Sequence, residues 1–149
     1  MDETVKYSTI YRSVRKHLID NLYDTEGIDI SFDRKIELPY LHNKDLTRWV
    51  SVLLKDSVID QMFEQNVEIY CCTRKDPEGI DRADLVDSVL GVFISDNGNK
   101  YTVPLYESDF ETIVGYATPF PRVAQNNIPL EDETMYTLIR VVLQWAAKL

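Results

Sequence analysis

Few residues of this chain are suited to thiol, acid–base or metal chemistry once its abundant carboxylates are set aside. The 149-residue sequence contains two cysteines and two histidines. Cys71 and Cys72 are adjacent, whereas a structural zinc site needs about four ligands, often at CxxC spacing. Neighbouring side chains of a strand point to opposite faces, so the two thiols are not expected to share an ion or act as a redox pair. We interpret one as a core residue and the other as part of the opposite face.

The histidines are the remaining candidates for catalysis. His17 lies beside the apolar stripe of a predicted helix, and His42 lies in a polar segment. Catalytic sets assemble in space, so neither is excluded by its position in the sequence. No GxSxG, Walker or GxGxxG motif accompanies them, and the acidic runs "LEDETM" and "GIDRADLVD" are typical of solvated surfaces. We therefore predict no catalytic residue, no metal ligand and no cofactor.

The segment "TRKDPEG", residues 73–79, combines basic and acidic residues at a predicted strand-to-helix corner. Asp76 is a good N-cap, Pro77 suits the first helical position, and Glu78 lies favourably against the helix dipole. An anion site at this helix start is opposed by the two carboxylates. The corner is thus predicted to be structural, which leaves Arg74 and Lys75 without a local role.

Two amphipathic helices are predicted to position these residues. The first spans Thr4 to Tyr23, with Gly27 as its stop signal, and the second spans Pro77 to Ile94. The buried stripes are expected to contain Ile10, Val14, Leu18 and Leu22 in the first helix and Val86, Val89, Leu90 and Phe93 in the second.

Alternating apolar residues predict strands over 28–33 and 63–73. Residues 48–54 are apolar on both faces and predict a central strand, and residues 101–106 and 110–117 are predicted to be extended. Pro104 predicts an edge strand, because proline cannot donate to a ladder. Residues 117–129 are too rich in proline for regular structure and are predicted to form a long functional loop. Residues 134–146 fit a helix or a strand, and their β-branched and aromatic content favours the strand.

Bulk composition limits the class of protein. Length indicates one domain, residues 1–149. A formal net charge of −9 argues against general attraction to nucleic acid or anionic membranes. No apolar run approaches the roughly 20 residues that span a bilayer, and the N-terminus lacks a signal core, so we expect a protein kept in a reducing cytoplasm.

A resemblance to a known family rests on the order of these elements. The chain has an N-terminal amphipathic helix, a "WV" strand, the "EIYCCTRKDPEG" corner, the "RADLVDSVLGVF" helix and a β-rich tail. In this order it resembles the tail terminator (tail completion) proteins of tailed bacteriophages. The likeness is strongest over Trp49 to Phe93.

The resemblance implies an α+β fold, with a mixed, mainly antiparallel sheet, two main helices packed on one face, and an extended loop or hairpin arm. It implies a virion protein, assembled in the bacterial host cytoplasm, that forms a ring, commonly a hexamer. The ring ends tail-tube growth and joins the tail to the head connector, with the tail sheath as a further candidate partner. Genomic DNA passes through its lumen without specific binding. Such proteins are not enzymes and carry no cofactor.

A ring of identical subunits needs two different complementary patches on each subunit. The candidate contact residues are Arg74, Lys75, Glu78, Arg122 and Arg140. The basic pair Arg74–Lys75 is a candidate partner for the acidic face of the second helix. Two alternatives stay open: another neck or head-joining interaction protein, and a small metal-dependent hydrolase.

Overall fold

The computed structural model describes residues 6–33, 47–58, 62–130 and 133–146. His42 and the rest of residues 34–46, between the first two predicted strands, lie outside these residues. The elements, in chain order, are α1 (Tyr7–Leu18), the π-helical turn η1 (Ile19–Tyr23), α2 (Asp24–Glu26), β1 (Ile30–Phe32), β2 (Arg48–Val58), β3 (Met62–Arg74), α3 (Ile80–Leu90), β4 (Val103–Tyr106), β5 (Ile113–Pro129) and β6 (Thr134–Ala146).

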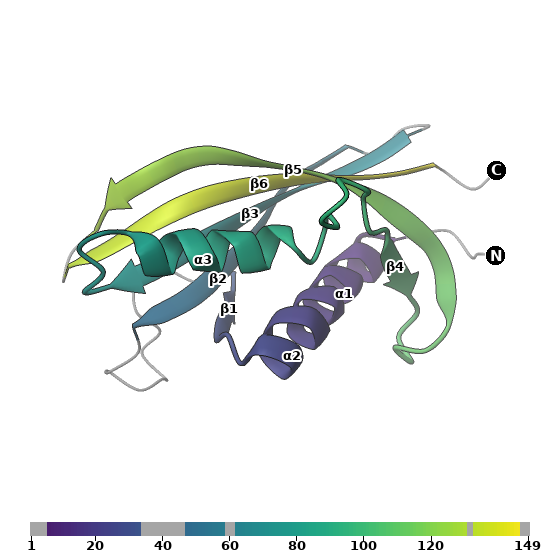
Figure 1. The fold of residues 1–149 in the computed structure, drawn as a ribbon. Helices are drawn as coiled ribbons and strands as arrows, with labels where there is room; N and C mark the ends of the chain where they lie inside the picture. Colours follow the sequence, from purple (N-terminus) through teal and green to yellow (C-terminus); the bar gives the residue numbers. More distant parts are fainter. Residues whose placement is uncertain (1–5, 34–46, 59–61, 131–132, 147–149) are drawn as a thin grey trace.

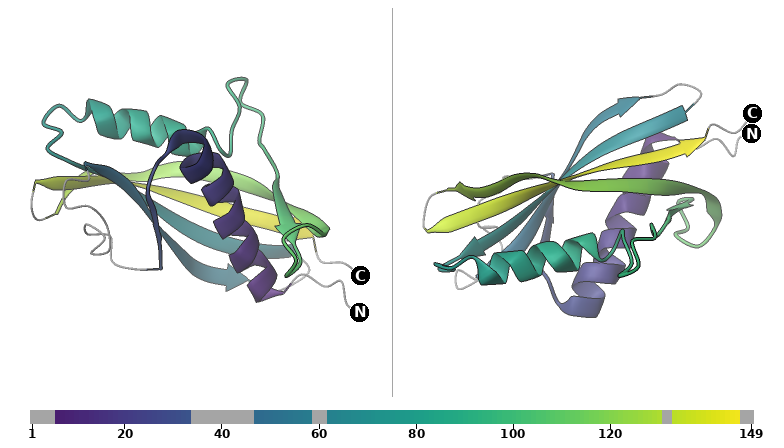
Figure 2. Two further views of the ribbon diagram at one scale, coloured as in Figure 1. Left: turned by 90° about the horizontal axis from the view of Figure 1, so that it is seen from below. Right: turned by 45° about the horizontal axis from the view of Figure 1, so that its top comes forward.

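One curled six-stranded sheet has the order β1-β2-β3-β6-β5-β4 (Figure 1). The β1–β2 pair is parallel, and all other pairs are antiparallel. Both long helices lie on the same face of the sheet, as the two views of Figure 2 show. The predicted fold class, α+β with two helices on one face of a mainly antiparallel sheet, is confirmed.

The first helical segment has the predicted apolar stripe. Ile10, Val14, Leu18 and Leu22 are all buried. Helical structure continues through η1 and α2 to Glu26, beyond the predicted end at Tyr23. Gly27 then adopts a left-handed conformation, φ 69°, as its predicted role as stop signal requires.

The second helix begins and ends differently from the prediction. It was expected from Pro77 with Asp76 as N-cap, but Ile80 is its first residue and Gly79 occupies the cap position with φ 74°. The N–H of Gly79 donates to the carbonyl of Asp76 at 3.1 Å. Asp, Pro and Gly at the first, second and fourth positions are typical of a β-turn, and that turn replaces the expected first helical turn.

The buried face of α3 also differs in detail. Leu85 is fully buried and was not among the residues predicted there, whereas Val86 and Leu90 are only partly buried. The helix ends at Leu90, and Val92 and Phe93 continue as turns rather than as helix.

The prediction of a loop over residues 117–129 is wrong. These residues belong to β5, a 17-residue strand that runs antiparallel to β6. Its register shifts twice, between Val123 and Gln125 and again before Ile128. The strand assignment for residues 134–146 is confirmed, as is the position of Pro104 on an edge strand, β4.

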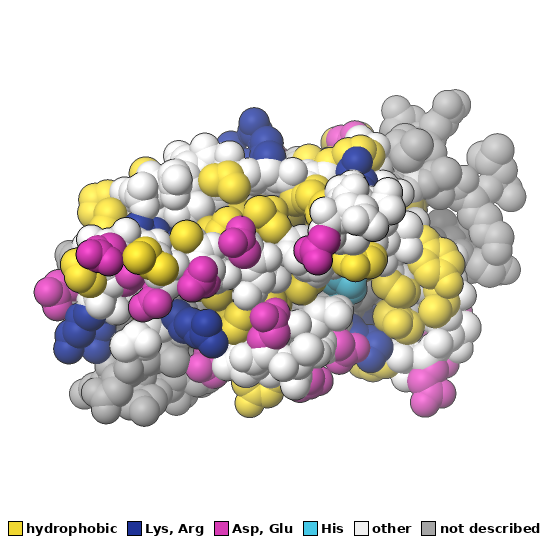
Figure 3. Space-filling view, in the orientation of Figure 1, with side chains coloured by type: hydrophobic (Ala, Val, Ile, Leu, Met, Phe, Trp, Pro, Cys, Tyr) yellow, Lys and Arg dark blue, Asp and Glu magenta, His cyan; other side chains and the backbone are white. Residues whose placement is uncertain are grey.

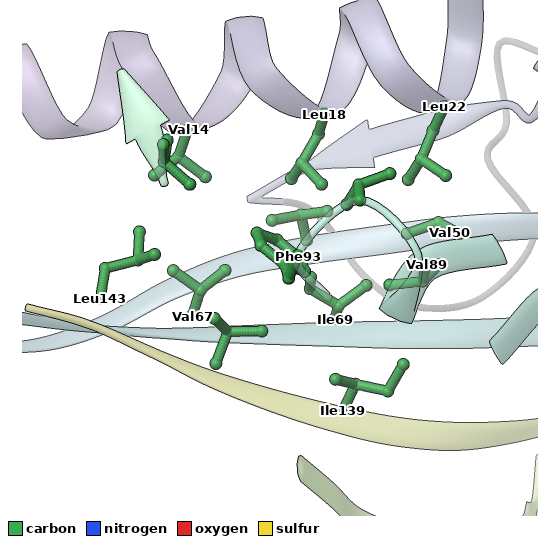
Figure 4. Close-up of a cluster of buried hydrophobic side chains, with 14 of the residues drawn as sticks. Val14, Leu18, Leu22, Val50, Val67, Ile69, Val89, Phe93, Ile139 and Leu143 are labelled. Carbon is green, nitrogen blue, oxygen red and sulfur yellow. The ribbon is translucent and has the colours of Figure 1, made fainter. Parts of the chain in front are cut away.

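A single apolar cluster fills the space between the helices and the sheet (Figure 4). Val14, Leu18 and Leu22 descend from the first helical segment onto Val67 and Ile69 of β3 (Figure 4). Cys71 belongs to this cluster, whereas Cys72 is buried outside it. The alternation predicted for the two cysteines is therefore present.

Candidate functional site

The corner between β3 and α3 is organised by a buried arginine. Arg82, whose side chain is 5% exposed, lies 3.7 Å from the Asp76 carboxylate and donates to the Thr73 hydroxyl at 3.1 Å. Its guanidinium also donates to the side-chain carbonyl of Asn127. Three elements, β3, α3 and β5, are joined through this one side chain.

Asp76 caps α3 from a distance. Although Gly79 holds the cap position, the Asp76 carboxylate accepts the backbone N–H groups of Arg82 at 3.0 Å and Asp81 at 3.4 Å. Burial opposes ionisation of this carboxyl group, but these N–H groups and the Thr73 hydroxyl together lower its pKa below the usual value. Asp76, the residue predicted as the helix cap, therefore accepts N–H groups of the first helical turn as a cap does, although it does not occupy the cap position.

Asn127 reaches the corner because β5 is bulged. The residue has φ 56°, in the left-handed region, within the second register shift against β6. Neither Arg82 nor Asn127 was predicted as a site residue. Arg82 looks like a solvated residue of an acidic helix face in the sequence, and only the doubly bulged strand brings Asn127 beside it.

The predicted interface residues of the corner are placed unequally. Arg74 is half-buried at the end of β3, and its backbone N–H donates to the backbone carbonyl of Thr47 at 2.8 Å. Lys75 is exposed with φ 58°, and Glu78 is exposed on the turn before α3. Lys75 and Glu78 are thus the parts of the corner that solvent or a partner can reach.

Arg122 and Arg140 lie on the sheet face that the helices leave bare. They are register partners on β5 and β6. Arg140 donates to the Glu68 carboxylate at 3.2 Å, and Lys55 lies 3.9 Å from the same carboxylate. Tyr70 donates its hydroxyl to Glu68 at 2.8 Å.

Glu68 is the centre of this bare face. Burial, followed by the hydrogen bond to Glu68, raises the pKa of Tyr70 to about 12, so the phenol remains a donor at neutral pH. Phe120 of β5 is 42% exposed, close to the arginine pair along the strand. The face therefore combines fixed charges with exposed aromatic surface, a composition found at protein–protein contacts.

His17 is a structural residue in this geometry. Its Nε2 lies 2.9 Å from the Val92 carbonyl, to which it donates, and its ring lies beside Phe93. Burial lowers its pKa, against the opposing effects of the Val92 hydrogen bond and Asp20. A cleft of about 740 Å³ opens beside it, between α1 and the segment that follows α3.

The cysteines offer no reactive group at this surface. Burial raises the pKa of the Cys71 thiol, which keeps it protonated. In the described ranges, no three His, Cys, Asp or Glu side chains gather in a way that could hold a metal ion. Within those same ranges, no helix has the length and apolar character to cross a membrane.

Comparisons with known proteins give a fold and no family. No family model and no curated protein matches the chain. Eight chains of solved structures match, and one of them does so with a TM-score of 0.51 and 6% identity, over 93% of this chain and 96% of that chain. The name of that protein describes no activity. The likeness shows that the same arrangement occurs in another protein of similar extent.

Proposed function

We propose that this chain is a virion structural protein of the tail terminator type. It forms a ring, hexameric by analogy with the family it resembles, at the head-proximal end of a phage tail. The ring ends polymerisation of the tail-tube protein and joins the tail to the head connector. It has no catalytic role and needs no cofactor.

The sheet face that the helices do not cover is the observation that carries this proposal; Trp49, Cys72 and Leu138 are buried on part of it, and Phe120 and Arg122 are exposed on another part. Most sheets of α+β domains bury one face and leave the other to solvent or to a partner. Here that face holds a carboxylate, Glu68, fixed by Arg140, Lys55 and Tyr70, with Phe120 exposed nearby. Fixed charges beside an exposed aromatic ring suit docking of another protein. Arg122 and Arg140 are therefore proposed to contact the tail-tube protein or a neighbouring subunit.

Solution mass and tube length test the proposal. The full chain, measured by light scattering, is expected at six times the mass of one chain. Added to polymerising tail-tube protein, it is expected to shorten the tubes seen by electron microscopy. A chain that stays monomeric over a wide concentration range and leaves tube length unchanged would contradict the proposal.

Variants of Arg122 distinguish an effect on the proposed contact from an effect on the stability of the monomer. Arg122 is exposed opposite Arg140, and like charges opposite each other destabilise a strand pair. Arg122→Glu is expected to stabilise the monomer by about 0.5 kcal/mol through a cross-strand ion pair. The same change is expected to weaken tube capping. Arg122→Gln is the control: it removes the repulsion without adding a carboxylate, so its stability is expected to lie between those of the wild type and Arg122→Glu. Capping that survives Arg122→Glu unchanged would remove this face from the proposal.

A further inference from the structure

The outer side of α3 presents one acidic stripe, which we call the α3 stripe. It consists of Ile80, Ala83, Asp84 and Asp87, all exposed. The spacing i, i+3, i+4, i+7 places them on one side of the helix, opposite the buried Leu85. Ile80, at 58%, is the most exposed of the large hydrophobic side chains in the described residues. In Figure 3, acidic side chains gather along this helix.

No described residue forms an ion pair with the carboxylates of this stripe, Asp84 and Asp87. The one basic residue of α3, Arg82, is turned inward to the corner. A helix side with one apolar anchor and two exposed aspartates fits a groove that is basic and aromatic.

Such a groove lies along α1. It has a volume of about 610 Å³, and Tyr7, Tyr11, Arg12, Arg15 and Phe110 are among its lining residues. We call it the α1 groove. Lys16 and Asp20, at its margin, form an ion pair at 2.9 Å and so cancel each other's charge. Arg12 and Arg15 remain as its net positive charge.

The two arginines are held in place before any partner arrives. The guanidinium of Arg12 donates to the Tyr106 carbonyl at 3.3 Å and lies 5.9 Å from the centre of the Phe110 ring. Arg15 lies over the Phe32 ring at 4.3 Å. An arginine stacked on an aromatic ring keeps N–H groups available in its plane for carboxylates.

The tip of the β4–β5 turn adds an unusual feature to the groove. Phe110 is 48% exposed and has φ 59°. A bulky aromatic residue seldom adopts this left-handed conformation, and strain of this kind tends to accumulate at functional sites. The conformation holds an aromatic ring at the mouth of the groove.

The geometry points to a second copy of this chain as the occupant: the α3 stripe of one subunit docks in the α1 groove of the next. Asp84 and Asp87 meet Arg12 and Arg15, and Ile80 packs against the exposed ring of Tyr7. The helix that carries the stripe, α3, and the first turns of α1, which line the groove, begin toward opposite ends of the helical layer (Figures 1 and 2). A contact between two different, well-separated patches is heterologous, and repeating it gives a ring when the rotation between neighbouring subunits closes.

The sequence suggested a different pair of patches, Arg74–Lys75 with the acidic helix. In the structure, α3 begins only five residues after Lys75, at the same corner. Complementary patches that adjoin on one corner favour a two-fold dimer, which cannot add further copies. The α1 groove is the basic patch placed to extend a ring. This inference rests on the proposed function, since it supplies the contact between subunits of the proposed ring.

Reciprocal charge reversal tests it. The stripe variant carries Asp84→Arg and Asp87→Arg, and the groove variant carries Arg12→Asp and Arg15→Asp. Each variant alone then meets like charges at every contact, and its self-association is expected to weaken by more than about tenfold. An equimolar mixture makes every contact complementary in an alternating ring, so assembly is expected to return to the wild-type mass. Light scattering measures all three samples, and circular dichroism confirms that each variant folds.

A second pair of variants tests the same contact and leaves Arg12 and Arg15 unchanged, so a folding defect in the groove variant does not decide the outcome. Ile80→Asp and Tyr7→Ser alter side chains that are more than half exposed and remove the apolar anchor from either side. Each is expected to weaken assembly while the monomer stays folded.

The outcomes separate this inference from the proposed function. Wild-type rings together with both charge variants assembling alone would place the subunit contact elsewhere and overturn the inference, while the ring proposal stands. A groove variant that self-associates normally but no longer binds tail-tube protein would make the groove a tube site, which also overturns it. A wild-type chain that is monomeric alone and on tubes would overturn both.

Discussion

At the residue scale, Arg82 is the side chain on which the corner depends most. It is buried and serves Thr73, Asp76 and Asn127 together. Arg82→Ala leaves the Asp76 carboxylate without its cation, and breaking a buried pair in this way costs about 3 kcal/mol of unfolding free energy. Urea unfolding followed by circular dichroism measures the loss.

The matched control is Asp84→Ala, on the exposed side of the same helix. An exposed substitution of this kind is expected to change the unfolding free energy by less than about 0.5 kcal/mol. Equal unfolding midpoints for the two variants would show that the Arg82 network contributes nothing to stability.

His17 makes the stability of the fold depend on pH. Its pKa in the folded chain lies below the usual value of 6.5, chiefly because burial disfavours the charged ring. The unfolded chain therefore binds the proton more readily, so stability is full above about pH 6.5 and falls as pH drops toward the lower, folded-state pKa. His17→Gln removes this titration.

The measurement is the urea midpoint at pH 7.5 and at pH 5, compared between wild type and His17→Gln. The variant is expected to lose less stability on acidification than the wild type. A parallel decline in both chains would show that His17 titrates alike in the folded and unfolded states.

At the scale of elements, periodicity was a reliable guide where one pattern dominated. The apolar stripe from Ile10 to Leu22 has helical spacing only, and the helix is present. Residues 134–146 fit both the helical and the strand period, and the preference of β-branched residues for strands gave the correct prediction. The Asp76 carboxylate in the "TRKDPEG" segment identified this residue as a cap, but the segment did not distinguish a β-turn from a first helical turn.

The prolines of residues 117–129 led to the prediction of a loop where the structure has β5, and their positions in the strand explain why. Pro119 and Pro121 stand two residues apart and pair in register with Leu143 and Val141. Residues two apart direct their N–H groups to the same side of a strand, so both prolines can occupy positions that point away from β6. β4 pairs only with residues up to Ala117, so in the described residues this stretch is an edge. Prolines on an edge strand hinder the addition of a further strand. The proline-rich composition that predicted a loop therefore belongs to an edge strand that is protected in this way.

The site was harder to predict than the fold because its parts come from distant segments. Asn127 lies 45 residues after Arg82, and a bulged register brings them together. Arg12 and Phe110 lie further apart still, on α1 and on the β4–β5 turn. Local spacing carries no signal for such pairs. The cross-strand pair Arg122–Arg140 was named from charge alone, and the structure places the two side by side.

At the scale of the whole molecule, the chain is acidic overall but carries its cations in separate groups. The chain carries a net charge of −9. Among the described residues, cations line the α1 groove, the corner and the sheet face without helices, and the groove and that sheet face are each partly neutralised by a carboxylate, Asp20 or Glu68. A net charge of this sign opposes the binding of a nucleic acid backbone, which needs a continuous basic track.

The assembled protein is therefore expected not to retain DNA. Proteins that bind duplex DNA without sequence preference do so with dissociation constants of about 10⁻⁴ to 10⁻⁶ M at physiological salt, and tighter as salt falls. Fluorescence anisotropy of a labelled duplex at about 0.05 M salt is the most demanding test, because phosphate contacts are strongest there. Anisotropy is expected to stay flat with both dilute and assembled protein. Binding that weakens steeply with added salt would reveal a basic lumen created by assembly, and would contradict a ring through which the genome slides without being held.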